Sequence, residues 1–256
     1  MMNARIVIIL LCLCMPLRTA AQSADSLQAD HVDKTTKFKA TQLIIPGTLI
    51  AASTFGLWNN WTKSANIAVR DKMAEIRTHK ITFDDYVQYL PVVSYVGLGA
   101  IGAKSKHNFK ERLLVTGTSY LSMGIMVNAV KYSVKEMRPD NSKRNSYPSG
   151  HTATVFMGAE LVRSEYGVGY GVAAYTVACG IAFMRLYNNR HWMTDVLAGA
   201  GIGILSARIG YWMLPVTRRW FGMERNRNKA TDMAFTTAPF YDYNTHAVGG
   251  TLALVF

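Results

Sequence analysis

The sequence contains little cysteine and little negative charge. Of its three cysteines, Cys12 and Cys14 lie in one apolar run near the N-terminus, and Cys179 lies alone inside another. This spacing gives no indication of a structural disulfide, and Cys179 is interpreted as a small buried apolar residue. Internal repeats and low-complexity tracts are also missing. A length of 256 residues suits one domain with a sizeable core and is too short for two ordinary domains with linkers.

Charged residues make up only 17% of the chain, and they are unevenly divided. There are 28 Lys and Arg residues against 16 Asp and Glu, which gives a formal net charge of +12. Such an excess is typical of proteins that bind nucleic acid, anionic lipid or a phosphorylated substrate. The basic residues form short clusters between apolar blocks, without a recognised nucleic-acid motif. We therefore expect no nucleic-acid partner and favour an anionic lipid or a phosphate.

Half of the residues are hydrophobic, and they gather in long blocks. Each block is helical by its length and its lack of strict alternation, and most approach the roughly 20 residues of a transmembrane helix. The predicted fold is therefore all-α: a polytopic helical bundle of about five to six apolar helices, within a domain over residues 43–216. A mean hydropathy of only +0.07 keeps a soluble helical protein as the alternative. The blocks cover residues 43–58, 86–103, 113–130, 152–162, 167–186 and 193–214.

The N-terminal segment differs from these blocks. Residues 1–22 resemble a secretory signal peptide, with Arg5 before a short apolar run and small residues at its end. The run is short for a bilayer span, so we expect cleavage near Ala21, with an uncleaved anchor as the alternative. Residues 23–42 are predicted to be a polar linker.

The C-terminal segment, residues 217–256, is predicted to be a basic stretch followed by a short β-hairpin. Residues 235–241 and 248–256 are rich in β-forming side chains and flank a turn-like sequence that begins at Asp242. Just before this segment, Gly199 and Gly203 form part of a small-residue stripe that predicts close helix packing.

Three motifs carry candidate chemistry, and the first is a pair of cations. Lys131 and Arg138 flank the end of an apolar helix, where fixed positive charges can hold a phosphoryl group without a metal. The alternative is a positively charged flank at a membrane boundary.

The second motif, Pro148-Ser149-Gly150-His151, directly precedes an apolar helix. Gly150 allows close backbone approach, Ser149 offers a hydroxyl, and the amides of a helix N-terminus attract an anion. His151 beside such an anion is well placed to protonate a leaving oxygen. The alternative is an ordinary Pro-Ser helix cap followed by a chance histidine.

The third motif contains Arg185, His191 and Asp195. With Asn189 as a candidate N-cap, His191 and Asp195 lie four residues apart on one helical face, so the carboxylate can orient the imidazole. Arg185 adds a further cation. A lone histidine near a helix start is usually a cap or a solvated residue, but all three motifs lie at helix ends, and the helix count returns them to the same side of the bundle.

Together the motifs resemble the signature of the type-2 phosphatidic acid phosphatase superfamily, over roughly residues 86–215. The one departure is Met184, which stands where family members usually carry serine. The resemblance implies that His191 attacks phosphorus, Asp195 orients it, and His151 protonates the leaving alkoxide and then activates water. It also implies a phosphate site made by the remaining residues: Lys131, Arg138, Ser149, Gly150 and Arg185.

The function expected from the resemblance is hydrolysis of a membrane lipid phosphomonoester or pyrophosphate through a phosphohistidine, without metal or cofactor. Lipid A phosphate, undecaprenyl pyrophosphate and phosphatidylglycerol phosphate are candidates. The two ends of the chain are similar to those of lipid A phosphatases of Bacteroides-type bacteria. A secreted, soluble acid phosphatase of the same superfamily is the alternative, and a non-enzymatic scaffold for anionic lipid leaves the paired histidines unexplained.

The basic loop 104–112 predicts the orientation in the inner membrane. By the positive-inside tendency this loop is cytoplasmic, which puts the three motifs on the periplasmic side. A cleaved signal conflicts with a span at 43–58, because every later helix would then be inverted. We therefore expect 43–58 either to lie along the interface or to span with the signal-like segment uncleaved and not crossing.

Overall fold

The computed structural model describes residues 35–223, 234–242 and 247–255. The signal-like segment 1–22 lies outside these described residues. The chain falls into two compact units, Met1–Thr217 and Arg218–Phe256. The boundaries predicted for linker, helical domain and C-terminal segment stay predictions.

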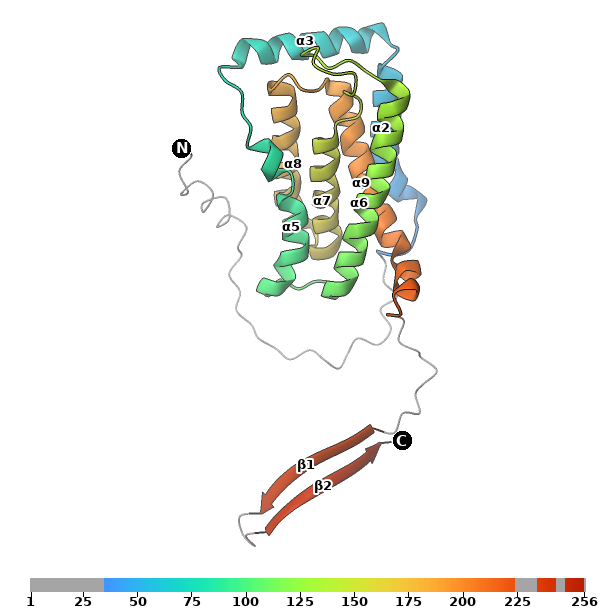
Figure 1. Ribbon diagram of the computed structural model, residues 1–256, viewed down its shortest axis with the longest axis vertical. Helices are drawn as coiled ribbons and strands as arrows, with labels where there is room; N and C mark the ends of the chain where they lie inside the picture. The colour runs from blue at the N-terminus through green and yellow to red at the C-terminus, as the bar shows by residue number, and fades with distance from the viewer. Residues whose placement is uncertain (1–34, 224–233, 243–246, 256) are drawn as a thin grey trace. The chain divides into compact units, whose positions relative to one another are not determined.

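The first unit is a bundle of helices (Figure 1). Each of the six predicted apolar blocks coincides with helical structure, so the prediction of an all-α bundle with several apolar helices is confirmed. The helices are η1 (Ala40–Leu43), α2 (Ile44–Gly56), α3 (Asn60–Ile76), α4 (Asp84–Val87), α5 (Leu90–Gly97), η2 (Leu98–Ile101), α6 (Phe109–Val134), α7 (Gly150–Tyr166), α8 (Val168–Tyr187) and α9 (Met193–Trp220).

Helix α3 lies between the first two apolar blocks, in a stretch where no helix was predicted. Asn59 caps it by accepting a hydrogen bond from the Trp61 amide at 2.8 Å. The axes of the α2 and α3 segments differ in direction by 95°, and α3 lies across one end of the bundle (Figure 1). Its charged side chains pair along the exposed face, as Lys72 does with Glu75 at 2.7 Å. Because charged residues interrupt its apolar residues, α3 does not form an apolar block in the sequence.

Three of the described helices, α6, α8 and α9, are long and apolar enough to cross a membrane. The bent pair formed by Ala40–Gly56 and α3 adds a fourth if it is counted as one span. Large apolar side chains on α6 and α8 remain exposed, among them Leu121, Ile125 and Val172. An exposed apolar surface on membrane-length helices is suited to contact with lipid.

Helix α2 runs alongside α9. At one end Gln42 accepts a hydrogen bond from the Trp212 indole at 3.0 Å. At the other end Gly56 lies against Thr194, and between the two Gly201 packs on Ile50. Helix α2 thus follows a membrane-length helix along its own length. The two placements expected for residues 43–58 stay predictions.

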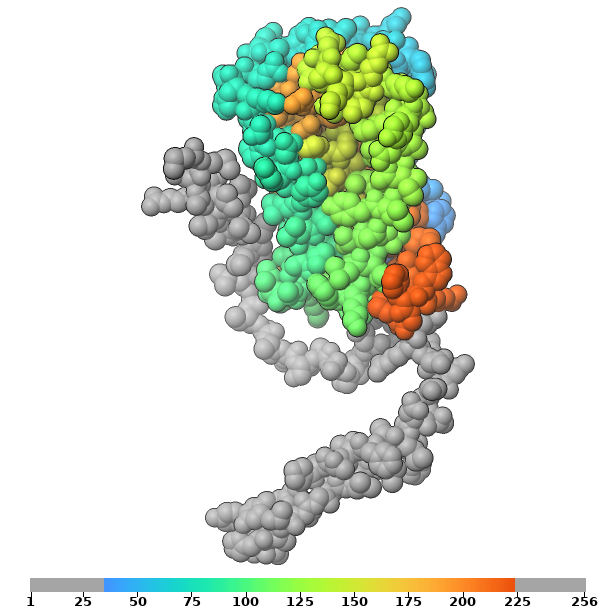
Figure 2. All heavy atoms as spheres, in the orientation of Figure 1, coloured from blue at the N-terminus to red at the C-terminus, as the bar shows by residue number. Residues whose placement is uncertain are grey.

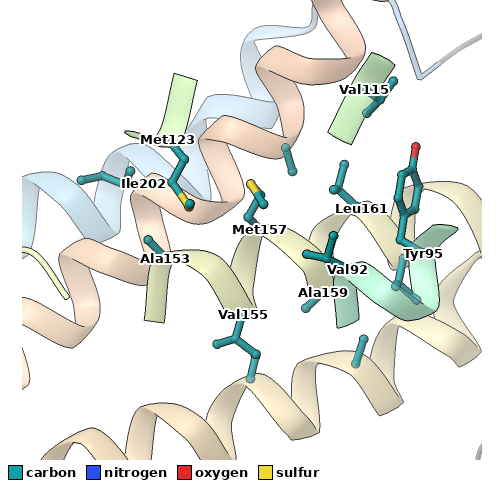
Figure 3. Packing of buried hydrophobic residues seen from close by; sticks show 14 of the residues in the cluster. Val92, Tyr95, Val115, Met123, Ala153, Val155, Met157, Ala159, Leu161 and Ile202 are labelled. Carbon is teal, nitrogen blue, oxygen red and sulfur yellow. The ribbon is translucent and has the colours of Figure 1, made fainter. Parts of the chain in front are cut away.

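Helix α7 lies at the centre of the bundle, and its side chains meet those of several neighbours (Figure 3). Met157 and Leu161 of α7 share one apolar cluster with Tyr95 of α5, Val115 of α6 and Ile202 of α9. This cluster therefore joins helices that are distant in sequence and fixes α7 against its neighbours.

The predicted small-residue stripe of α9 packs against α7. An added side chain at Gly199 or Gly203 would collide with backbone atoms of Ser149 or Ala153, respectively. Farther along, Glu160 of α7 accepts hydrogen bonds from Arg163 and pairs with other α8 and α9 side chains, so its buried carboxylate is fully engaged. Close backbone contact and paired charges thus fix α7 against α9.

The second unit contains strands β1 (Ala234–Asp242) and β2 (Ala247–Val255). They pair antiparallel, with Ala234 opposite Val255 and Asp242 opposite Ala247. The connecting residues 243–246 lie outside the described residues, so the predicted C-terminal hairpin stays a prediction.

We expect Gly203→Ala to destabilise the bundle. The added Cβ would meet the Ala153 carbonyl oxygen and lie 2.9 Å from the Met157 amide nitrogen, and neither atom can move without shifting α7. The expected loss is roughly 1–3 kcal/mol, seen as a lower Tm in detergent. Gly180→Ala is the matched control, because a Cβ there meets no atom within 4 Å. Equal Tm values for the two variants would contradict this packing.

Candidate active site

The three motifs meet at one end of the bundle, as their positions at helix ends predict. This end holds the last turn of α6, the first turn of α7 and the α8–α9 loop (Figure 1). On the surface, the α6–α7 loop (yellow-green) and the segment before α5 (teal) cover this end, with residues near the start of α9 (orange) visible between them (Figure 2). The candidate site is built from these segments.

The Asp195 carboxylate joins the second and third motifs. Its Oδ2 accepts hydrogen bonds from the Ser146 hydroxyl and from the Trp192 amide, the latter at 2.8 Å, and lies 3.4 Å from Nδ1 of His191. Its backbone oxygen accepts a bond from the Ser149 amide at 3.0 Å. A fully buried carboxylate needs such donors, so the loops that supply them are fixed around it.

His191 lies in the loop before α9, not on the helix. Asn189 is not the N-cap: it takes a positive φ of 58°, which asparagine tolerates, and turns the chain after α8. Helix α9 starts at Met193, and Asp195 accepts from the Trp192 amide as a capping carboxylate. His191 still reaches Asp195, because the loop brings the imidazole back over the first turn.

The His191 imidazole is buried, with 4% of its surface exposed. The pKa of His191 is lowered to about 4: burial is the main cause, the cations Arg185 and Lys131 add to it, and Asp195 opposes it. The neutral form therefore persists well below neutral pH. A neutral imidazole oriented by a carboxylate has a free lone pair on its other nitrogen and can act as a nucleophile.

Ser149 caps α7. Its hydroxyl oxygen accepts bonds from the Thr152 amide at 3.5 Å and the Thr152 hydroxyl at 3.0 Å. Ser149 is therefore a helix cap, as the alternative interpretation of the second motif expected. This role leaves the Ser149 hydroxyl proton available to a ligand. An added Cβ at Gly150 would meet no atom within 4 Å, so the first turn of α7 opens on free space beside His151. An anion can approach the helix amides there.

The predicted cations converge on the same end. Lys131, in the last turn of α6, donates to the Asn145 carbonyl at 2.5 Å, and Arg138 lies half-buried in the following loop. Burial, together with Arg190 and Arg185, lowers the pKa of Arg138, opposed by Asp140 and Asp195. Buried Nε atoms of Arg138 and Arg185 have no hydrogen-bond partner in the described part of the chain. Unsatisfied cations facing one another favour a bound anion.

Sequence reasoning missed three side chains at this site. Ser146 donates to Asp195, Asp84 pairs with Arg185 at 2.5 Å, and Asp85 lies 2.8 Å from Nε2 of His151. The available signals were weak: Ser146 stands just before the second motif, and two adjacent acids are unusual in a chain with few of them.

Helix α3 supports the loop that carries His191 from outside. Asn66 donates to the Thr194 hydroxyl at 3.0 Å and accepts from the Thr194 amide at 3.3 Å. The guanidinium of Arg70 lies 5.8 Å from the centre of the Trp192 ring, a cation–π contact. Two residues that follow His191, Trp192 and Thr194, are thereby held, which restricts the movement of His191.

This geometry provides the groups for phosphoryl transfer: an oriented imidazole, a second histidine and several cations. Among the described residues, no group of three or more His, Cys, Asp or Glu side chains is placed to hold a metal ion. Whether catalysis needs a metal is a question for chelation experiments.

Comparison with known proteins agrees with this geometry. Residues 112–219 match the family model of the PAP2 superfamily. These residues are called the PAP2 segment. The PAP2 segment contains every predicted site residue, from Lys131 to Asp195, whereas Asp84 and Asp85 lie outside it.

A curated relative of the PAP2 segment is the lipid A 1-phosphatase of Porphyromonas gingivalis, 41% identical over 154 residues. The alignment covers 57% of this chain and 35% of the relative, so the chain spans about a third of the relative's length. Two solved structures are also similar. The crystal structure of Aquifex aeolicus LpxE has 21% identity and a TM-score of 0.43, covering 55% of this chain and 92% of that one. The first transmembrane PAP2 type phosphatidylglycerolphosphate phosphatase from Bacillus subtilis has 17% identity and a TM-score of 0.49, covering 71% and 99%.

We expect the His191 imidazole to titrate near pH 4. Between that value and 6.5 the buried imidazole stays neutral while the unfolded chain binds a proton, so the free energy of unfolding falls as the pH is lowered through this window. ¹³C NMR of histidine-labelled protein in detergent, assigned with His191→Gln, gives the midpoint. Asp195→Asn removes the carboxylate that favours the cation and should lower the midpoint further. A His191 midpoint at 6.5 or above is the contrary result.

Proposed function

We propose that this protein is a metal-independent phosphatase that hydrolyses a phosphate ester or pyrophosphate of a membrane lipid through a phosphohistidine intermediate. The observation that carries the proposal is the buried His191 held by Asp195, beside the cations Arg185 and Lys131. Phosphoryl transfer depends mainly on positioning and charge stabilisation, and fixed cations can supply the charge that Mg²⁺ supplies in other enzymes.

In the first step of this reaction, His191 attacks phosphorus and the bond from phosphorus to the leaving oxygen breaks. His151 gives its proton to the leaving oxygen. In the second step, His151 takes a proton from water, the resulting hydroxide attacks phosphorus, and the bond to His191 breaks. The phosphoryl oxygens are held throughout by Lys131, Arg138, Arg185, the Ser149 hydroxyl and the Gly150 amide.

A lipid substrate follows from the position of the site at the end of membrane-length helices. The phosphate of a lipid lies at the membrane surface, where these helices end, while its acyl chains remain in the bilayer. The relative named as a lipid A 1-phosphatase makes a phosphate of lipid A the first candidate. Undecaprenyl pyrophosphate and phosphatidylglycerol phosphate are the others. A soluble acid phosphatase is disfavoured, because it would have to cover the exposed apolar faces of α6 and α8.

We expect the detergent-purified protein to release phosphate from at least one of these lipids in the presence of EDTA, and His191→Gln to lose at least about 10³-fold of that rate. The loss follows because the covalent route disappears while packing stays intact. The matched control is His79→Gln, which changes the same residue type at an exposed side chain whose hydrogen bond is with the neighbouring Thr78 hydroxyl. Full activity of His191→Gln, or loss on chelation that a divalent ion restores, would overturn the mechanism.

The same proposal includes an orientation in the inner membrane, with the site facing the periplasm. The loop between η2 and α6, which contains Lys104 and Lys106, lies at the opposite end of α6 from Lys131. The cations around the site are explained by phosphate binding, so they say little about orientation. The positive-inside tendency is therefore applied to the loop between η2 and α6. Because α2 follows α9, with Gln42 beside Trp212, residues 35–39 are on the side of this loop. This position suits a signal-like segment that does not cross.

Cysteine labelling tests this orientation. In a variant whose three cysteines are replaced, Lys143→Cys in the α6–α7 loop and Lys104→Cys in the opposite loop are both exposed. In cells with a permeabilised outer membrane, an impermeant maleimide should label Lys143→Cys and spare Lys104→Cys until the inner membrane is opened. The reverse pattern would place the site in the cytoplasm.

A further inference from the structure

Two adjacent carboxylates from outside the PAP2 segment contact two of its site residues. Asp84 and Asp85 form the start of α4, which follows the α3 helix. This region is tied to the third motif, because Asn188 accepts from the Ile81 amide at 3.0 Å and donates to the Ile81 carbonyl at 2.6 Å. The two acids are therefore held beside the α8–α9 loop.

Asp84 is fixed and Asp85 is open to solvent. The Asp84 side chain is 1% exposed, and its Oδ2 lies 2.5 Å from one terminal nitrogen of Arg185, Nη1. The same Nη1 lies 3.5 Å from Oδ1 of Asp85, whose side chain is 56% exposed. Arg185 is thus held from one terminal nitrogen, while its buried Nε has no partner in the described part of the chain. An unpaired Nε belongs to the guanidinium edge that binds anions through two parallel bonds.

The second contact of Asp85 is with the general acid. Its Oδ1 lies 2.8 Å from Nε2 of His151. A carboxylate at this distance fixes a proton on Nε2 and stabilises the imidazolium, which leaves Nδ1 as the nitrogen that exchanges a proton. Burial and the Arg185 cation lower the pKa of His151, while the hydrogen bond and charge of Asp85 and the charge of Asp84 oppose that shift.

We propose that the acidic pair of α4 positions the catalytic groups: Asp84 orients Arg185 towards the phosphate, and Asp85 holds His151 as the general acid. The proposal rests on the phosphatase function and adds two positioning residues from a separate segment. In the first step of the reaction, the proton on Nδ1 of His151 moves to the leaving oxygen as the bond from phosphorus breaks. Nε2 keeps its proton, which stays hydrogen-bonded to Asp85. Water later returns a proton to Nδ1.

A different role for Asp85 would be as an internal anion that occupies the place of the phosphate and is displaced by substrate. Two observations favour positioning. Asp84 shares the same nitrogen of Arg185 and is buried, so this cation is engaged by an acid whether or not Asp85 moves. The Nε edge of Arg185 remains unpaired, so a phosphate can bind without displacing either acid.

The leaving group separates the two positioning roles. p-Nitrophenolate leaves with little protonation, whereas an alkoxide needs the proton of His151. Asp85→Asn should therefore lower kcat for an alkyl phosphate by about 10- to 100-fold and for p-nitrophenyl phosphate by less than about threefold. Asp84→Asn should affect both substrates alike, mainly by raising KM, because it releases Arg185. Loss of a merely structural contact would not depend on the leaving group.

Glu75→Gln is the matched control for Asp85→Asn. Its side chain is 65% exposed and pairs with Lys72 at 2.7 Å, so it too is an exposed acid paired with a cation. It should leave both rates unchanged. The histidine ¹³C NMR titration adds a measurement that needs no turnover: the pKa of His151 should fall in Asp85→Asn and stay constant in Glu75→Gln.

The outcomes are distinct. If the wild-type protein hydrolyses neither substrate, nor any of the lipids, the proposed phosphatase function fails. If it is active and Asp85→Asn reduces both rates equally, or leaves the His151 titration unchanged, the positioning role fails. Tighter binding of inorganic phosphate to Asp85→Asn with unreduced alkyl phosphate turnover would also overturn it, in favour of the displaced-anion role. A selective alkyl phosphate loss with a lowered His151 pKa supports it.

Discussion

The site depends on one buried carboxylate, that of Asp195. Removing a charged group from water is costly unless donors surround it, and here the donors come from different segments: the Ser146 hydroxyl, the Trp192 amide and the His191 imidazole. Because satisfying this charge requires the α6–α7 loop to meet the start of α9, folding of the two loops and alignment of the nucleophile are the same event. The backbone bond from Ser149 to Asp195 extends this coupling to the cap of α7.

The second constraint is mutual repulsion among the cations. Lys131, Arg138 and Arg185 act on one another within a partly buried region, and their charge destabilises the unliganded protein. The carboxylates of Asp84 and Asp195 offset part of this repulsion, but both are already engaged, Asp84 by Arg185 and Asp195 by the two loops around it. A bound phosphoryl group, and still more the transition state with its spread negative charge, relieves the remainder. The same groups that lower stability are thus those that favour the reaction.

Much of the fold could be predicted from the sequence, because block length and helix ends are local properties. The apolar blocks gave the helices of the bundle, and the three motifs at their ends gave the residues that meet at one side. The contacts of Asp84 and Asp85 could not be predicted in this way. Asp84 and Arg185 are 101 residues apart, and no periodicity links them. Helix α3 was missed for a different reason: its charges mask a helix whose role is to buttress Thr194, not to fill the core.

The position of α3 also relates the bundle to the membrane. The corner between α2 and α3 exposes Trp58 and Trp61 at the end of the bundle where the motifs meet. Tryptophan is enriched at the level of lipid headgroups, where its ring is apolar and its N–H can reach water. With this corner at the headgroup level, the cations of the site lie at the depth of a lipid phosphate. In the proposed reaction, such a lipid presents its phosphate to His191 while its acyl chains stay in the bilayer, so no apolar substrate has to be extracted into water.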